Sequence, residues 1–97
     1  MFKKLDPIFN SPLRLAMVSM LMANEEVEFN TFKEKTKATA GNLSVQINKL
    51  KAAGYIDVIK QFKHNYPQTI CKITEQGKEA FNDYEDALKS YFNKKQE

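Results

Sequence analysis

The sequence has few of the residues that build metal centres, disulfides and many active sites. Its 97 residues include one cysteine, one histidine, three glycines and no tryptophan. The single cysteine, Cys71, excludes an intramolecular disulfide and favours a reducing, cytoplasmic setting. A zinc site needs about three or four protein ligands, which Cys71 and His64 do not supply within one chain. We therefore expect no metal and no other cofactor.

Long apolar runs, low-complexity segments and enzyme motifs are also missing. No run approaches the roughly 20 apolar residues that a membrane-crossing helix requires. The segment from Met1 to Pro7 lacks the apolar core of a signal peptide. The chain has no glycine-rich phosphate loop, no carboxylate pair in apolar surroundings and no Ser/His/Asp set. We expect a cytoplasmic protein that has no membrane partner and is not an enzyme.

The length and charge distribution are more informative. Ninety-seven residues that are 42% hydrophobic suffice for one small domain. We predict a single domain over 1–97, with a core over about 11–74 and a C-terminal helix over about 75–93. Residues 30–72 hold eight lysines against two acidic residues, a net charge of +6, although the whole chain carries only +3. Such a basic segment is typical of a phosphate-binding surface, and also of a solvated lysine-rich face.

Capping residues predict the first helices. Ser11 precedes a proline and suits the start of a helix that runs to about Ala23. Residues 27–29 alternate briefly, as a very short strand does. A two-turn helix is expected over about 31–36, with Asn30 as its N-cap.

The segment over about 39–53 predicts the most informative helix. Thr39 suits its N-cap, and Gly54 lies just past its end, where a left-handed residue closes a helix. Its apolar residues are spaced by four and then three, so they line one face: Leu43, Ile47 and Leu50. The opposite face offers short polar side chains to a partner.

Two β-rich segments and a last helix complete the pattern. Residues 55–62 and 68–73 flank a polar tip, so they pair as a hairpin. Thr74 suits the cap of the last helix, in which large apolar residues recur at intervals of three and four. The predicted fold is mainly α with a small β-hairpin: a winged helix-turn-helix with an additional C-terminal dimerisation helix.

This order of elements indicates double-stranded DNA as the partner. The major groove admits one helix, and its base edges present distinct donors and acceptors that side-chain amides can pair with. We predict that the recognition helix, about 39–53, enters the major groove and that the wing, about 62–68, lies on the backbone or in the minor groove. Lysines neutralise phosphates without reading sequence. The predicted DNA-binding residues are Thr39, Gly41, Asn42, Ser44, Val45, Gln46, Asn48, Lys49, Lys35, Lys37, Lys60, Lys63, His64, Asn65 and Tyr66.

The last helix has two interpretations: its aromatic stripe packs on its own domain or joins a second copy. A domain this small has little core surface for four large apolar groups, which favours a homodimer. A symmetric dimer also matches a palindromic operator, because two linked contacts add affinity. The predicted dimer interface comprises Phe2, Leu5, Ile8, Phe9, Phe81, Tyr84, Leu88, Tyr91 and Phe92.

Three segments carry a family resemblance: Leu5–Ala16 (LDPIFNSPLRLA), Ala40–Ile56 (AGNLSVQINKLKAAGYI) and Ile73–Phe81 (ITEQGKEAF). They resemble the small stand-alone winged-helix transcriptional regulators of the MarR and ArsR groups, and the resemblance covers nearly the whole chain. It implies a homodimer that binds operator DNA through the third helix and the wing. The paired Cys or His ligands of ArsR-type metal sensors are absent.

Two alternatives stay open at this point. One is a winged-helix protein-interaction module that does not bind DNA, but an interaction surface on the third helix should be apolar, and this one offers mainly amides and lysines. The other is a ligand-responsive sensor with a pocket between the first helix and the dimer helices. The methionines and aromatics permit a small-molecule effector without requiring one.

Overall fold

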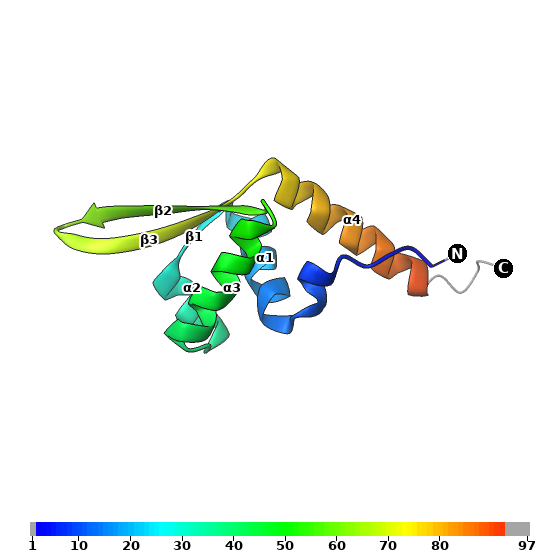
Figure 1. The fold of residues 1–97 in the computed structure, drawn as a ribbon, viewed down its shortest axis with the longest axis horizontal. Coiled ribbons are helices and arrows are strands. Elements are labelled where there is room, and N and C mark those ends of the chain that lie inside the picture. Colours follow the sequence, from blue (N-terminus) through cyan, green and yellow to red (C-terminus); the bar gives the residue numbers. More distant parts are fainter. Residues whose placement is uncertain (1, 93–97) are drawn as a thin grey trace.

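The computed structural model describes residues 2–92 (Figure 1). Within them, four α-helices accompany a three-stranded antiparallel sheet with the strand order β1-β3-β2. This confirms the predicted fold class. The elements in chain order are a 3₁₀ turn (Pro7–Asn10), α1 (Pro12–Asn24), β1 (Glu26–Glu28), α2 (Phe29–Thr36), α3 (Ala40–Ala52), β2 (Ile56–Lys63), β3 (Tyr66–Ile73) and α4 (Glu75–Phe92).

Three of the predicted helix caps are confirmed. Ser11 Oγ accepts a hydrogen bond from the Arg14 backbone N–H at 3.2 Å. Thr39 does the same for the N–H of Asn42, also at 3.2 Å. Thr74 Oγ1 accepts from the N–H of Gly77 at 2.9 Å. Each hydroxyl thus satisfies one of the N–H groups that a helix leaves unpaired in its first turn.

The predicted cap of α2 is wrong. The helix begins at Phe29, and Glu28, not Asn30, occupies the N-cap position without a side-chain hydrogen bond. The cause is the sheet: Glu26–Glu28 pair with β3, and Glu28 lies opposite Ile70. Pairing holds Glu28 in an extended conformation, so the helix can start at the next residue.

The hairpin of β2 and β3 is longer than predicted and closes at a tighter tip. Its register runs from the pair Ile56–Ile73 to the pair Lys63–Tyr66. His64 and Asn65 form the turn, with φ angles of +52° and +66°. Two left-handed residues define the tight turn whose twist matches that of paired strands. Pro67 fits inside β3 because β1 ends beside Ile70, so the outer edge of β3 at Pro67 has no ladder bond to lose.

The core lies between α1, α2, α3 and the sheet. Cys71 packs there with no exposed surface, and burial raises the pKa of its thiol to about 11. Phe9 connects this core to α4, because its ring centroid lies 5.0 Å from that of Tyr84 and 5.8 Å from that of Phe81. The largest fully buried side chains are Phe9, Phe32, Met17, Leu21, Leu43, Leu50, Ile56, Val18 and Cys71.

Helix α4 projects away from the body of the molecule, and the N-terminal segment runs back along its far end (Figure 1). The backbone N–H of Lys3 donates to Ser90 Oγ at 3.1 Å, and the Tyr91 hydroxyl donates to the Lys3 carbonyl at 3.1 Å. The rings of Phe2 and Tyr91 lie 4.9 Å apart. The first residues are therefore part of the α4 surface of their own chain. The predicted helix end at residue 93 lies outside the described residues.

Candidate nucleic-acid interface

Helix α3 presents one buried and one exposed face. Leu43, Ile47 and Leu50 point into the core, as predicted. The exposed face carries Asn42, Ser44, Val45, Asn48 and Lys49. Val45 is 50% exposed, so an apolar side chain stands in the open among amides and hydroxyls. This mixture has the chemistry for reading base edges, because amides pair with them and an apolar group contacts a thymine methyl.

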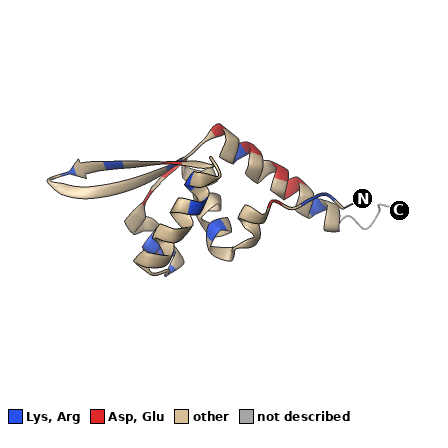
Figure 2. Ribbon diagram, viewed as in Figure 1, with Lys and Arg blue, Asp and Glu red and all other residues tan. Residues whose placement is uncertain are grey.

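Basic residues predominate around α3, and acidic residues predominate on α4. Figure 2 shows basic residues on α2, α3 and the hairpin, whereas acidic residues are concentrated along α4, which also carries basic ones. The exposed lysines around α3 are Lys33, Lys35, Lys37, Lys49, Lys51, Lys60 and Lys63. The exposed acidic residues of α4 are Glu75, Glu79, Asp83, Glu85 and Asp86. The positive potential therefore coincides with the surface formed by α3 and the hairpin.

A depression of about 280 Å³ joins α3 to the hairpin. Its polar rim is formed by Ser44, Asn48 and Lys51 from α3 and by Lys60 and Thr69 from the two strands. Ammonium, hydroxyl and amide groups suit a phosphate oxygen. Sequence reasoning did not include Thr69 among the site residues, because only the strand register brings Thr69 opposite Lys60.

The hairpin continues this surface outward as a wing, defined here as residues 60–69. Its outer part carries two exposed aromatic rings, Phe62 (78% exposed) and Tyr66 (75%). Because side chains alternate along a strand, Phe62 lies on the same face as Lys60, next to the α3 depression. Residues 58–71 contain no aspartate or glutamate. Sequence reasoning did not predict Phe62 as a site residue. Its position two residues after Lys60 nevertheless indicates that both side chains lie on the same face of β2.

Gln46 occupies a different place from the other polar residues of α3. It is half-buried and turned toward α1, where Arg14 Nη1 donates to its Oε1 at 2.6 Å. Gln46 Nε2 in turn donates to Asn42 Oδ1 at 2.9 Å. Sequence reasoning missed Arg14, because it lies 32 positions before Gln46 and no local pattern connects the two.

The residues predicted for the dimer interface separate into three groups. Phe9 and Tyr84 are 1% and 8% exposed, so they belong to the core of the single chain and offer a partner almost no surface. Leu5, Ile8, Phe81 and Leu88 are partly buried against that core. Phe2, Tyr91 and Phe92 remain exposed at the far end of α4.

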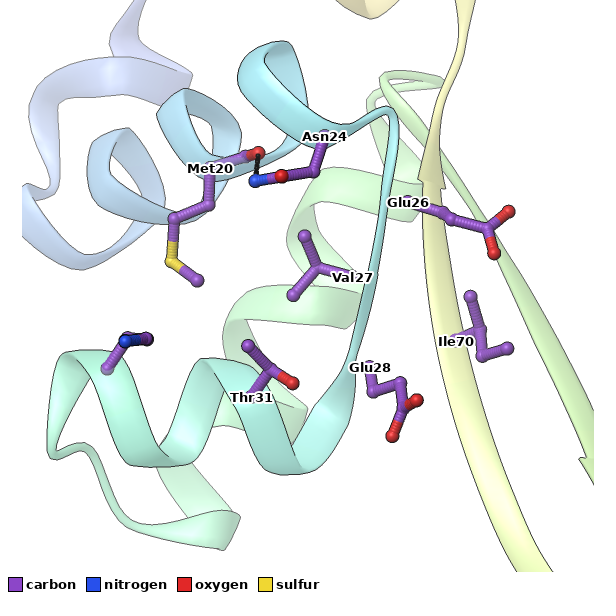
Figure 3. Close-up of a pocket in the computed structure, with 8 residues that line it drawn as sticks. Met20, Asn24, Glu26, Val27, Glu28, Thr31 and Ile70 are labelled. Atoms are coloured by element: carbon purple, nitrogen blue, oxygen red, sulfur yellow. Dashed lines mark hydrogen bonds between the residues drawn. The ribbon is translucent and has the colours of Figure 1, made fainter. Parts of the chain in front are cut away.

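A hollow of about 390 Å³ lies between the end of α1, β1 and α2 (Figure 3). Met20, Val27 and Ile70 form its apolar lining, and Asn24 donates a hydrogen bond to the Met20 carbonyl at 2.9 Å. None of its lining residues comes from α4. It is therefore not the pocket that the sequence suggested between the first helix and the dimer helices.

Two further searches of the described residues concern metals and membranes. Over residues 2–92, no group of three or more His, Cys, Asp or Glu side chains is placed to hold a metal ion. Among the helices described, none combines the length and apolar character that crossing a membrane requires.

Three helices, a small sheet and a projecting hairpin beside a basic third helix define a winged helix-turn-helix protein of the nucleic-acid-binding kind. Residues 13–92 match the family described as the winged helix DNA-binding domain. The chain belongs to that family. This match covers every element from α1 to α4.

Known proteins agree with this assignment. An uncharacterized protein of Methanocaldococcus jannaschii is 39% identical over 77 residues, which cover 79% of this chain and 84% of that protein. A transcriptional regulator homologue from Pyrococcus horikoshii OT3 has a similar structure, with a TM-score of 0.85, 24% identity and coverage of 95% of this chain and 91% of that one. The regulator BldR from Sulfolobus solfataricus has a TM-score of 0.71 and 19% identity, covering 86% of this chain and 58% of its own. The family match and these structures confirm that the chain shares the winged-helix fold of such transcriptional regulators.

Proposed function

We propose that the protein is a sequence-specific transcriptional regulator that binds double-stranded DNA as a homodimer. The observation that carries this proposal is the continuous polar and basic surface of α3, the depression beside it and the wing. A protein-docking face would be largely apolar at its centre. The exposed side of α3 instead carries amides, a hydroxyl and lysines, with Val45 as its apolar member.

In the proposed complex α3 lies in the major groove. Asn42, Val45, Asn48 and Lys49 face the base edges, since they share the exposed side of the helix. Phosphate groups lie near the N-terminus of α3, where free N–H groups and the helix dipole favour anions. The phosphate-contacting side chains in this proposal are Thr39, Ser44, Lys35, Lys37, Lys51, Lys60 and Lys63.

The wing lies along the backbone or in the minor groove in this proposal. His64, Asn65 and Tyr66 are all exposed at its tip. Phe62 adds an apolar ring on the face next to α3, and minor-groove proteins use such rings as wedges between base steps. The wing therefore combines charge neutralisation at Lys60 and Lys63 with an apolar contact.

The test is the salt dependence of binding to duplex DNA, measured by fluorescence anisotropy. Each phosphate contact lowers the slope of log K against log salt by about 0.9, so about six contacts reduce affinity roughly a thousandfold between about 50 and 200 mM salt. Lys51→Gln should reduce that slope by about one contact, because Lys51 contacts a phosphate in this proposal, whereas Lys89→Gln on α4 should not change it. Affinity that is insensitive to salt would contradict the proposal.

A second experiment, selection of bound duplexes from a random pool, tests sequence specificity and symmetry together. A recovered palindrome is the expected result, because two-fold protein symmetry matches two-fold operator symmetry. A pool that shows no enrichment would exclude sequence-specific reading and favour the interaction-module alternative.

A further inference from the structure

We propose that Arg14 sets the direction of hydrogen bonding along α3, so that Asn42 presents its amide NH₂ group to DNA. Arg14 and Gln46 are positioning residues in this inference, and Asn42 determines base preference. The inference rests on the proposed function, because it specifies how α3 reads one base position.

The three side chains form a continuous chain of hydrogen bonds. Arg14 is fixed at its other side, since its Nε donates to the carbonyl oxygen of Ile8 at 2.7 Å. Its Nη1 donates to Gln46 Oε1 at 2.6 Å, and Gln46 Nε2 donates to Asn42 Oδ1 at 2.9 Å. Arg14 and Gln46 are both half-buried, whereas Asn42 is exposed. This series of hydrogen bonds thus leads from the 3₁₀ turn to the DNA-facing side of α3.

The direction of this chain follows from the chemistry of the guanidinium group. Arginine has donors and no acceptor, so the Gln46 atom that meets Arg14 is the amide oxygen. The other end of the Gln46 amide is then an NH₂ group, which only donates. Asn42 must therefore meet Gln46 with its oxygen. Within residues 2–92, the NH₂ group of Asn42 is the part of that side chain left for an external partner.

A donating group distinguishes bases by their major-groove edges. Guanine presents the acceptors N7 and O6 there and thymine presents O4, whereas adenine combines its N7 acceptor with an amino donor and cytosine presents an amino donor alone. An unconstrained asparagine pairs with adenine by donating to N7 and accepting from N6. With its oxygen engaged by Gln46, Asn42 loses the bond from adenine N6 and keeps only its donor, so it favours a keto base, which presents no opposing amino group at that acceptor. Its place in the first turn of α3 adds positive potential, which also favours an acceptor.

The experiment compares base preferences by selection from a random duplex pool, and Asn42→Ala identifies the position that Asn42 reads. In the wild type, guanine or thymine should be preferred there by about tenfold. Gln46→Glu should reverse the preference toward adenine or cytosine, because a carboxylate still accepts from Arg14 but forces Asn42 to turn its NH₂ inward. Arg14→Met leaves both amides free to rotate, so adenine should become acceptable beside the keto bases.

A matched control separates orientation from charge. Lys51→Gln changes the net charge by the same amount as Gln46→Glu and lies outside the hydrogen-bonded chain, so it should lower affinity without altering base preference. Thermal melts show that each variant is folded, and Arg14→Met serves if Gln46→Glu does not fold. An unchanged preference in both Gln46→Glu and Arg14→Met overturns the inference alone. A wild type that enriches no sequence overturns the proposed function and the inference with it.

Discussion

At the residue scale, Gly41 and Gly77 are both glycines in the first turn of a helix but have different surroundings. A Cβ atom added at Gly41 would meet no atom of the protein within 4 Å. A Cβ atom added at Gly77 would lie 2.3 Å from the backbone carbonyl oxygen of Tyr55. Packing within the protein therefore requires a glycine where α4 crosses Tyr55. At Gly41 the protein itself imposes no such requirement, so only an external partner of α3 could favour glycine there.

Gly41→Ala should stabilise the protein and weaken DNA binding. Alanine is favoured over glycine in a helix by about 0.5–1 kcal/mol. Gly41 is also one of the predicted DNA-binding residues, and an added Cβ atom there would hold the duplex further from α3. Denaturant unfolding measures the first effect, and anisotropy measures the second. Gly77→Ala is the matched control and should lose about 1–3 kcal/mol of stability, because a backbone carbonyl cannot move aside easily. Unchanged DNA affinity in Gly41→Ala would exclude close approach at this helix end.

The raised pKa of Tyr55 leads us to expect that the folded protein loses stability in alkaline solution. Burial, and then its hydrogen bond to Asp6 and the charges of Asp6 and Asp83, raise the pKa of Tyr55 from 10.0 to about 12. The unfolded chain loses this proton near pH 10 while the folded chain keeps it, so stability falls as pH rises between those values. Urea unfolding at a series of pH values should show this decline and a flatter one in Tyr55→Phe.

The thiol of Cys71 adds a decline of the same sign, because its pKa is raised from 9.0 to about 11. Since Cys71 is present in both proteins, the difference between wild type and Tyr55→Phe isolates the tyrosine. Parallel declines in the two proteins would show that Tyr55 titrates alike in the folded and unfolded states.

At the scale of elements, the fold could be predicted from local sequence signals. Features that depend on contacts between distant residues could not. The caps Ser11, Thr39 and Thr74 act on N–H groups three residues away, so the sequence contains both partners of each bond. The start of α2 depends on the pairing of β1 with β3, more than forty residues later in the chain. The same limit explains why the polar residues of α3 were predicted as a group, whereas the bond from Arg14 that turns Gln46 aside was not.

The wing yields a prediction at this scale. Phe62→Ala should lower DNA affinity by about tenfold, equivalent to burying roughly half of a phenylalanine side chain. It should leave the salt slope unchanged, because an apolar contact is lost and no charge is. Lys60→Gln on the same face should instead reduce the slope by about one phosphate contact. Folding stability should hardly respond to Phe62→Ala, since the ring is 78% exposed. Equal salt slopes and equal DNA affinities in wild type and Phe62→Ala would show that the Phe62 ring does not contact DNA.

At the scale of the whole molecule, the chain is more extended than a compact domain of its length. Its radius of gyration is 15.1 Å, against about 12.5 Å expected for a compact fold of this size. The wing extends one end of the long axis and α4 the other (Figure 1). The far end of α4 leaves Phe2 and Phe92 68% and 72% exposed. Large apolar groups gathered on a projecting element are typical of an interaction surface.

The proposed homodimer assigns a second copy of the chain to this surface. Phe92→Glu should therefore shift the protein from dimer to monomer in sedimentation velocity, because a carboxylate would be buried without a partner. Asn82→Glu adds the same charge to an exposed polar position of α4 and should leave the dimer intact. Because two linked half-sites add affinity, Phe92→Glu should weaken binding to a palindromic duplex far more than binding to a single half-site. A dimer that survives Phe92→Glu would place the interface elsewhere, and equal losses on both duplexes would show that dimerisation and DNA binding are not linked.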